Sequence, residues 1–367
     1  MARQRVVAAM SGGVDSAVAA ALLKQQGYDV IGVTMQIWPK SKEDPLQEKP
    51  GGCCSLGAVD DARAVAYKLN IPYYVLNMQQ QFEQEVVQYF CREYARGRTP
   101  NPCIVCNTKL KFKSLLEKAL VLGADYVATG HYARIKYSYK KKRYVLQEAV
   151  DKHKDQSYAL YDLNQYQLAH TLFPLGELTK EETRSIAAEL GLTVAAKHDS
   201  QEICFVPDDD YRSFLYQRIP TAIKPGPFVN QSGQVLGTHS GLPFYTIGQR
   251  RHLGISSSKR LYVVDIDPER NVIILGEERD LLRSKIRVEQ VNWVSVAPPQ
   301  KPIEAAVRVR YRGMLSQARL IPDKDSGVVV EFVQPARAPA PGQAAVFYQG
   351  EEVLGGGIIT PKGSIAN

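Results

Sequence analysis

One short segment near the start of the chain constrains its fold more than any other. Residues 6–10 are apolar, Ser11-Gly12-Gly13-Val14-Asp15-Ser16 follow directly, and apolar residues at helical spacing begin at Val14. A glycine-rich turn between a strand and a helix points backbone N–H groups at one spot, and such a spot binds phosphate. The segment therefore predicts a nucleotide site at the carboxyl end of a first strand.

Each residue type in this turn suits a bound nucleotide. Gly12 and Gly13 let the backbone approach the anion closely, and Ser11 and Ser16 offer hydroxyl donors. Asp15 can hold a Mg²⁺ ion that neutralises the phosphates. The turn is not a Walker A loop, because the Gly-Lys-Ser/Thr ending is missing.

The first part of the chain alternates strand-like and helix-like segments. Apolar runs at 6–10, 30–35, 73–76 and 126–129 are separated by segments with apolar residues at helical spacing, and Thr179 and Glu182 form a capping-box pattern before a helix that Gly191 ends. This alternation predicts an α/β fold with a doubly wound parallel sheet.

The pattern changes after about residue 210, where short strands and turns replace the helical period. We expect a catalytic domain over 1–209, a small, mainly β central domain over 210–284 and a C-terminal β-barrel over 285–362. Between Ile135 and Val145, the basic stretch KYSYKKKRY is expected to form an exposed hairpin tip, most simply a solvated one.

The chain has 367 residues and a formal net charge of +8, which favours a polyanionic partner such as nucleic acid. No apolar run approaches the length that spans a bilayer, so we expect no membrane partner and a cytoplasmic location. The pattern is compatible with a monomer.

Three of the six cysteines lie in segments that suggest chemistry. Cys103 and Cys106 follow a proline-rich turn and come just before an expected helix with three lysines, and Cys204 follows Lys197 and His198; nearby cations lower the pKa of a thiol. The C-x-x-C spacing also suits a metal, but a second such pair is absent. Cys53 and Cys54 are interpreted as loop residues, with a sulfur relay as the alternative, and Cys91 as a core residue.

The Ser11–Ser16 turn closely resembles the PP-loop of the N-type ATP pyrophosphatases, which cleave ATP between its α and β phosphates. Together with TGHYAR at 129–134, KDQSYAL at 154–160, GLPFYTIGQRRHLGI at 241–255 and the cysteine segments, it makes the whole chain resemble the tRNA-specific 2-thiouridylase family (MnmA/TrmU). The resemblance implies that ATP adenylates the C2 carbonyl oxygen of the wobble uridine in tRNA, and that a cysteine persulfide then replaces AMP with sulfur.

The resemblance also implies roles for individual residues. Cys204 would carry the persulfide, and Cys106 would attack or resolve it, leaving a Cys106–Cys204 disulfide. ATP would be bound by Ala9, Met10, Ser11, Gly12, Gly13, Val14, Asp15, Ser16, Met35 and Gly130. The target base would meet Asn101, Pro102 and Cys103, and further tRNA contacts would come from His131, Lys154, Asp155, Gln156, Arg310, Tyr311 and Gln343. The implied partners are the anticodon arm of Lys-, Glu- or Gln-type tRNA and a persulfide donor, either a sulfur carrier or a cysteine desulfurase.

The sequence departs from the family pattern at one position, because Cys103 follows Asn-Pro where the family has Asp. A role that rests on that carboxylate does not carry over. Three alternatives stay open: an iron–sulfur cluster held by Cys103, Cys106 and Cys204, which we do not favour; a PP-loop synthetase for a small molecule; and a non-catalytic RNA-binding redox module. His131 is alternatively a buried structural histidine, and Arg310 and Tyr311 alternatively form a solvated face.

Overall fold

The structure is a computed structural model that describes residues 3–37, 56–197, 203–206, 210–323 and 326–362. The chain divides into two compact units, and each is described by itself. The first unit contains Met1–Val86, Cys103–Asp209 and Glu351–Val353, and the second contains Val87–Pro102, Asp210–Gly350 and Leu354–Asn367. The three-domain boundaries expected from the sequence stay a prediction.

A five-stranded parallel sheet organises the first unit, as the alternating pattern predicted. Its strands, in spatial order, are β3 (Tyr73–Asn77), β2 (Asp29–Gln36), β1 (Arg5–Ala9), β4 (Tyr126–Ala128) and β7 (Thr171–Leu172). Val6 of β1 lies opposite Val30 on one side and Tyr126 on the other. The chain order reverses direction between β1 and β4, and ligands of such sheets bind at this switch point, outside the carboxyl ends of the strands.

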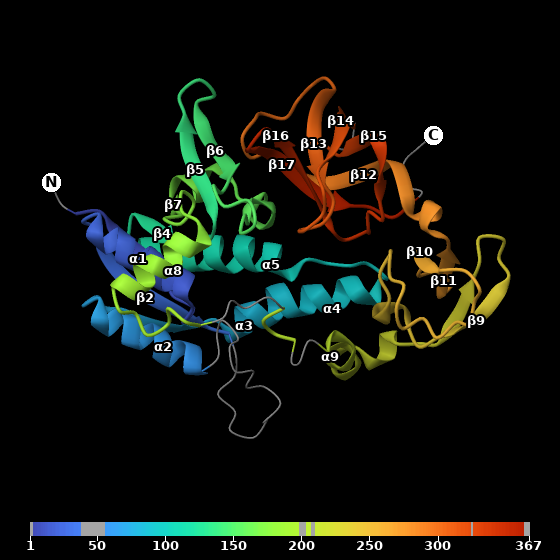
Figure 1. Ribbon diagram of the computed structural model, residues 1–367, viewed down its shortest axis with the longest axis horizontal. Helices are drawn as coiled ribbons and strands as arrows, with labels where there is room; N and C mark the ends of the chain where they lie inside the picture. Colours follow the sequence, from blue (N-terminus) through green and yellow to red (C-terminus); the bar gives the residue numbers. More distant parts are fainter. Residues whose placement is uncertain (1–2, 38–55, 198–202, 207–209, 324–325, 363–367) are drawn as a thin grey trace. The chain divides into compact units, whose positions relative to one another are not determined.

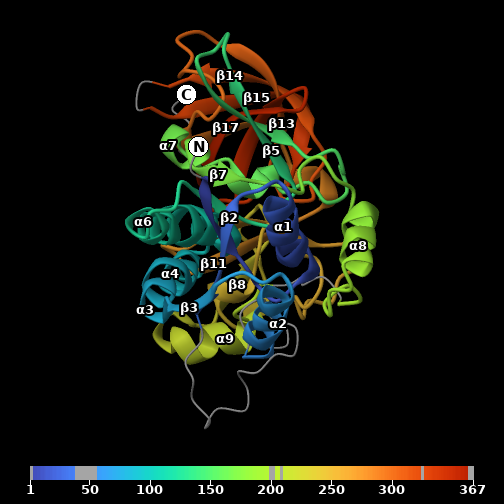
Figure 2. The ribbon, with the colours of Figure 1, turned by 90° about the vertical axis from the view of Figure 1, so that its left-hand side faces the viewer.

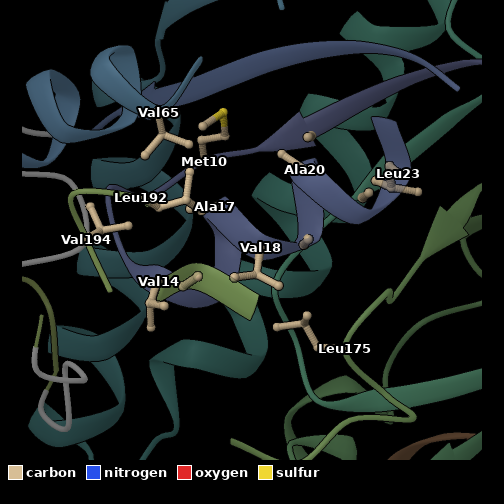
Figure 3. Close-up of a cluster of buried hydrophobic side chains, with 14 of the residues drawn as sticks. Met10, Val14, Ala17, Val18, Ala20, Leu23, Val65, Leu175, Leu192 and Val194 are labelled. Atoms are coloured by element: carbon tan, nitrogen blue, oxygen red, sulfur yellow. The ribbon is translucent and has the colours of Figure 1, made fainter. Parts of the chain in front are cut away.

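Helices cover both faces of this sheet (Figure 2). One face carries α1 (Val14–Gln25), α2 (Leu56–Lys68) and α8 (Lys180–Glu189), and α6 (Leu116–Val121) lies on the other. Figure 3 shows Ala17 of α1 near Met10 and near Val65 of α2, in a cluster of buried apolar side chains to which Val14 and Val18 also belong. The predicted capping box of Thr179 and Glu182 starts α8, so both the doubly wound fold and this helix start are confirmed.

The helix that carries the cysteine pair begins earlier than the sequence analysis expected. Its elements are α5 (Pro102–Val105), the π-helix η3 (Cys106–Leu115) and α6. Proline suits the first position of a helix, since its missing N–H is not needed there. The expectation that Cys103 and Cys106 precede the helix was therefore wrong: both lie in its first turns.

Several short elements complete the first unit. They are α3 (Gln79–Phe82), the π-helix η2 (Glu83–Val87), the hairpin strands β5 (Ala133–Ser138) and β6 (Arg143–Glu148), η4 (Ser157–Leu160) and α7 (Gln165–Ala169). Helix α4 (Gln88–Ala95) continues directly from η2 and belongs to the second unit. The expected apolar face of the segment from α3 to α4, formed by Phe82, Val86, Phe90 and Tyr94, is buried. Glu352 and Val353 pair with β6.

The second unit is mainly β beyond α4 (Figure 1). A four-stranded sheet, ordered β10-β11-β8-β9, contains β8 (Gly226–Val229), β9 (Val235–His239), β10 (Tyr262–Asp267) and β11 (Val272–Gly276). In sequence, α9 (Tyr211–Arg218) and η6 (Pro220–Ala222) precede it, η7 (Leu242–Phe244) lies between β9 and β10, and η8 (Glu278–Leu281) follows it. A barrel follows, ordered β12-β15-β14-β13-β16-β17 and closed by pairing of β12 with β17.

The barrel strands are β12 (Leu282–Asn292), β13 (Ile303–Arg308), β14 (Ser316–Pro322), β15 (Val328–Arg337), β16 (Ala344–Gln349) and β17 (Glu352–Ile359). Val307, Leu320, Val330 and Phe347 are among the side chains that fill it. The closed barrel expected from the sequence is therefore confirmed. Among the described residues, no helix combines the length and the apolarity that a membrane span requires.

Candidate functional site

The Ser11–Ser16 loop is held in shape by its own side chains. The Ser16 hydroxyl accepts from the backbone N–H of Ser11 at 3.1 Å and donates to the carbonyl of Gly13 at 3.0 Å. Gly13 is the N-cap of α1 and has no side chain that could occupy the N–H groups of the first turn. These donors, with the positive end of the helix dipole, suit an anion at the switch point of the sheet.

Two glycines let other segments close on this loop. A Cβ atom at Gly130, just after β4, would lie 2.7 Å from backbone atoms of Asp15 and Ser16. A Cβ atom at Gly12, whose φ is +67°, would lie 2.3 Å from the carbonyl oxygen of Ala58 in α2. Real Cβ atoms do not approach backbone this closely, so both positions require glycine. Gly130 lies against the loop, and its contact with ATP stays a prediction.

Asp15 is paired within the protein. Lys180 Nζ, on the first residue of α8, lies 2.7 Å from Asp15 Oδ1 and 2.9 Å from Oδ2. The Tyr132 hydroxyl donates to Oδ1 at 2.8 Å and lies 3.0 Å from Thr183 Oγ1. Lys180 is 8% exposed, so its ammonium needs the carboxylate partner. A Mg²⁺ ion at Asp15 would have to share or displace this lysine, and a magnesium role for Asp15 stays a prediction.

A second lysine, 185 positions along the chain from Gly12, also contacts the loop. Lys197 Nζ donates to the carbonyl of Gly12 at 3.1 Å and to Asp61 Oδ2, on α2, at 2.7 Å. Arg184 of α8 donates to the carbonyls of Ala195 and Lys197. The chain that leads toward Cys204 is therefore fastened to the loop and to α8.

The remaining nucleotide residues implied by the resemblance lie at strand ends beside the loop. The Met10 N–H donates to the carbonyl of Val33 at 2.8 Å, and Thr34 Oγ1 donates to the carbonyl of Met10 at 2.7 Å. Met10 and Met35 are buried and Ala9 is partly exposed. The loop N–H groups, two serine hydroxyls and two lysines fit the charge and donors that a nucleoside triphosphate requires.

The cysteine pair lies on a well-anchored helix. Cys103 is exposed and Cys106 partly exposed, and their spacing of three residues places them on one side of the helix. Asn107, the next residue, is buried; it donates to the carbonyl of Ala159 at 3.0 Å and accepts from Lys111 at 2.9 Å. Cys106 opens a π-helix, a rare element that occurs mostly at functional sites.

Cys204 lies in a turn closed by a hydrogen bond from the Val206 N–H to the Ile203 carbonyl, 3.1 Å long. The neighbouring Phe205 is buried and packs edge-to-face on Phe82 of α3, with ring centroids 5.6 Å apart. Helix α3 also packs on η3, the element that begins with Cys106. Cys106 and Cys204 are therefore supported by the same helix, and their disulfide stays a prediction.

His131 and the 154–156 segment have internal roles. His131 is buried, its Nδ1 lies 2.7 Å from Thr129 Oγ1, and burial, with a smaller effect of Lys111, holds its pKa well below the ordinary value. Asp155 accepts from the Ala149 and Ser157 N–H groups, and burial raises its pKa. Gln156 Oε1 accepts from the Tyr132 N–H at 3.0 Å. These contacts support the buried structural interpretation of His131 and hold Tyr132 in place.

The tRNA candidates of the second unit differ in exposure. Arg310 donates to the carbonyls of Ile247 at 2.7 Å and Ala338 at 2.9 Å, whereas Tyr311 is 38% exposed. Gln343 Nε2 donates to the carbonyl of Thr99 at 3.0 Å. Gln343 thus fixes the segment that leads into Asn101 and Pro102. Of these three candidates Tyr311 is the exposed one, and its contact with tRNA stays a prediction.

Sequence reasoning missed two lysines that contact the candidate nucleotide loop, Lys180 and Lys197. Lys180 and Lys197 are 165 and 185 positions from their partners Asp15 and Gly12, so no local pattern links them. Among the described residues, no group of three or more His, Cys, Asp or Glu side chains is arranged to hold a metal ion. Cys53, Cys54 and His198 lie outside the described residues.

A doubly wound parallel sheet with a Ser-Gly-Gly-Val-Asp-Ser loop at its switch point defines the class of ATP-using PP-loop proteins. Three family models match the chain: the tRNA methyl transferase HUP domain over residues 4–208, the tRNA methyl transferase PRC-barrel domain over 212–277 and the aminomethyltransferase beta-barrel domain over 283–359.

Curated relatives show to which family within this class the chain belongs. The chain is 54% identical to the tRNA-specific 2-thiouridylase MnmA of Heliobacterium modesticaldum over 97% of this chain and 92% of the relative. It is 52% identical to that of Acetivibrio thermocellus over 98% and 100% of the two chains, and 51% identical to that of Pelotomaculum thermopropionicum over 99% of each. The chain belongs to the tRNA-specific 2-thiouridylase (MnmA) family, as the sequence motifs indicated.

Proposed function

We propose that this chain is a tRNA 2-thiouridylase, a sulfurtransferase that uses ATP to replace the C2 oxygen of the wobble uridine with sulfur. The observation that carries the proposal is the self-closed Ser11–Ser16 loop at the switch point, in a chain about half identical to MnmA proteins over nearly its whole length. The products are 2-thiouridine in tRNA, AMP and pyrophosphate.

The PP-loop side chains serve the first step, in which the uridine C2 oxygen attacks the α-phosphorus of ATP and pyrophosphate leaves. The loop N–H groups and the Ser11 hydroxyl bind the phosphates, and the Ser16 hydroxyl joins them when it turns from the Gly13 carbonyl toward the nucleotide. Lys180 and Lys197 place two positive charges beside the loop. A Mg²⁺ ion, with Asp15 as its candidate ligand, would neutralise further phosphate charge. Adenylation is needed because a urea-like carbonyl is a poor electrophile and its oxygen leaves badly.

The cysteines serve the second step. The terminal sulfur of a Cys204 persulfide attacks C2, the C2–O bond breaks, and AMP leaves with the oxygen. The Cys106 thiolate then attacks Cys204 Sγ, which breaks the S–S bond, releases the thiouridine and leaves a Cys106–Cys204 disulfide. A dithiol reductant restores both thiols. The packing of α3 against both the Phe205 turn and η3 supports this pairing.

The finer assignments are parts of the same proposal. Asn101, Pro102 and Cys103 meet the target base, and Lys154, Tyr311 and the segment fixed by Gln343 contact the anticodon arm of Lys-, Glu- or Gln-type tRNA. His131, Asp155, Gln156 and Arg310 act by holding these elements. The persulfide comes from a sulfur carrier or cysteine desulfurase, and the protein works as a cytoplasmic monomer.

The test is nucleotide turnover with and without unmodified glutamate-type tRNA. We expect ATP to be converted to AMP and pyrophosphate only when that tRNA is present, and Cys204→Ser to retain the adenylation of the first turnover. AMP formation independent of tRNA would favour a small-molecule synthetase. No AMP formation under either condition would favour a non-catalytic RNA-binding module.

A further inference from the structure

The β5–β6 hairpin carries an unusual concentration of positive charge. Residues 133–147 contain six Lys or Arg residues and no Asp or Glu: Arg134, Lys136, Lys140, Lys141, Lys142 and Arg143. Three of these cations form ion pairs with acidic residues from elsewhere in the first unit. Glu351 and Glu177 pair with Arg134, Glu177 pairs with Lys136, and Glu352 pairs with Lys141.

The tip of the hairpin keeps uncompensated charge. Lys140 and Lys142 are exposed, and within the described residues neither forms an ion pair. Lys142 has a φ of +51°, which places it in the tight turn between the strands. A local surplus of exposed ammonium groups is favourable when a polyanion binds there, because phosphate contacts release counterions.

Aromatic rings accompany these lysines. Tyr137 and Tyr144 are cross-strand partners whose ring centroids lie 5.1 Å apart, and Tyr139 packs on Tyr137 at 5.2 Å. Tyr139 is 86% exposed and Tyr137 44%. An exposed tyrosine held by its neighbours loses little conformational entropy on binding, and its hydroxyl and ring face suit phosphate and base contacts.

The position of the hairpin relates it to the nucleotide site. Strand β5 begins at Ala133, three residues after Gly130, which lies against the PP-loop. A six-residue strand spans about 20 Å, so the tip lies roughly that far from the base of the hairpin. Figure 1 shows β5 and β6 extending together beyond β4 as a two-stranded arm of the first unit.

We propose that the tip of the β5–β6 hairpin, formed by Tyr139, Lys140 and Lys142, is a second RNA-binding surface that contacts the phosphate backbone of the tRNA away from the reacting uridine. This inference rests on the proposed function for the identity of the RNA. The contacts add affinity without reading sequence, because phosphates carry none. They hold the substrate but take no part in adenylation or sulfur transfer.

The experiment measures binding of unmodified glutamate-type tRNA to the full chain over a range of salt concentrations. For Lys140→Ala/Lys142→Ala we expect a several-fold weaker Kd at low salt and a salt slope shallower by about two, one for each lost phosphate contact. Lys140→Arg/Lys142→Arg keeps both positive charges and is expected to bind tRNA with the Kd and salt slope of the parent. Lys140→Ala alone is compared with Lys118→Ala, which removes one exposed lysine of α6 outside the hairpin and is expected to leave the Kd and the salt slope unchanged.

An unchanged Kd and salt slope in the double alanine variant would overturn the proposal. If tRNA binding is unchanged but sulfur delivery from the persulfide donor protein slows, the hairpin binds an acidic protein instead, which also overturns it. At saturating tRNA the variant is expected to match the parent in thiouridine formed per minute, with a raised KM. Because binding is measured directly, the hairpin can be tested even if the parent makes no thiouridine.

Discussion

The ammonium of Lys180 and the carboxylate of Asp15 form a two-point ion pair, 2.7 and 2.9 Å long, although 165 residues separate them. This contact joins the first turn of α8 to the PP-loop at the start of α1. Because Tyr132 donates to the same carboxylate, the loop is held from two directions before any nucleotide binds.

Removing the lysine is expected to destabilise the protein. In Lys180→Met the partly buried Asp15 keeps the Tyr132 hydrogen bond but loses its counter-charge, which should lower the free energy of unfolding by about 1.5–3 kcal/mol. Urea unfolding of the parent, Lys180→Met, Asp15→Asn and the double variant forms a double-mutant cycle, which isolates the interaction free energy of the ion pair. Additive effects of the two substitutions would show that the ion pair contributes nothing to stability.

The same cycle tests the predicted magnesium role. If Asp15 binds Mg²⁺ in the ATP complex, Asp15→Asn should reduce AMP formation far more than Lys180→Met does, and excess Mg²⁺ should partly restore it. Equal losses in the two variants, with no response to Mg²⁺, would restrict Asp15 to positioning the loop.

Gly130→Ala is expected to impair nucleotide binding without unfolding the protein. The added methyl would lie 2.7 Å from backbone atoms of Asp15 and Ser16, so the loop must shift, and a shift near 1 Å in a catalytic geometry can cost on the order of 10²-fold in rate. Gly57→Ala, on α2 with no atom within 4 Å of its new methyl, is the matched control. Steady-state AMP formation and far-UV circular dichroism give the two readouts; parental kinetics in Gly130→Ala would contradict the close packing.

Burial of neutral His131 should make stability depend on pH. The pKa of His131 is depressed in the folded state, so the unfolded chain binds the proton more readily. The contribution of His131 to the free energy of unfolding is therefore complete above about pH 6.5 and falls as the pH drops below that value. The slope is at most about 1.4 kcal/mol per pH unit.

Urea unfolding of the parent and of His131→Asn at several pH values measures this contribution as a difference. The difference is needed because Asp155, whose pKa is raised, acts in the opposite direction. A constant difference between the two proteins from pH 7.5 to 5.5 would show that His131 titrates normally.

Arg310 and Tyr311 are adjacent but should respond differently to substitution. Arg310→Ala loses two hydrogen bonds to backbone carbonyls and is expected to lower the free energy of unfolding by about 1–3 kcal/mol, and lysine cannot replace the forked guanidinium. Tyr311→Ala should leave stability nearly unchanged and raise the Kd for tRNA. Urea unfolding and tRNA binding of both variants check this; a Kd unchanged by Tyr311→Ala would remove Tyr311 from the RNA surface.

The sequence predicted those features of the fold that depend on local patterns. Apolar runs located β1 to β4, helical spacing located the buried face of α1, and Thr179 with Glu182 located the start of α8. Strand β7 was missed because two residues give no periodic signal. The start of the cysteine helix was misplaced because Asn101-Pro102 was taken as part of a turn, although proline at the first helical position is also a start signal.

In the candidate site, too, the residues within a contiguous motif could be predicted, and those that arrive through tertiary packing could not. The PP-loop was readable because its six residues are contiguous, and the cysteines were readable through the resemblance. Lys180, Lys197 and Tyr132 reach the loop through tertiary packing, and no spacing in one sequence encodes that contact. For Arg310 and Gln343 the resemblance gave positions, but only the structure shows that their side chains donate to backbone carbonyls.

Nucleoside mass spectrometry tests the thiouridylase function most directly. Unmodified glutamate-type tRNA is incubated with ATP, Mg²⁺, a persulfide donor and either the parent or Cys204→Ser, then digested and analysed. We expect the wobble uridine to exchange one oxygen for sulfur with the parent and to stay unmodified with Cys204→Ser. Absence of thiouridine with the parent, with tRNA and donor shown to be competent by another thiouridylase, would contradict the proposed function; equal product from both proteins would contradict the role of Cys204 as the sulfur carrier.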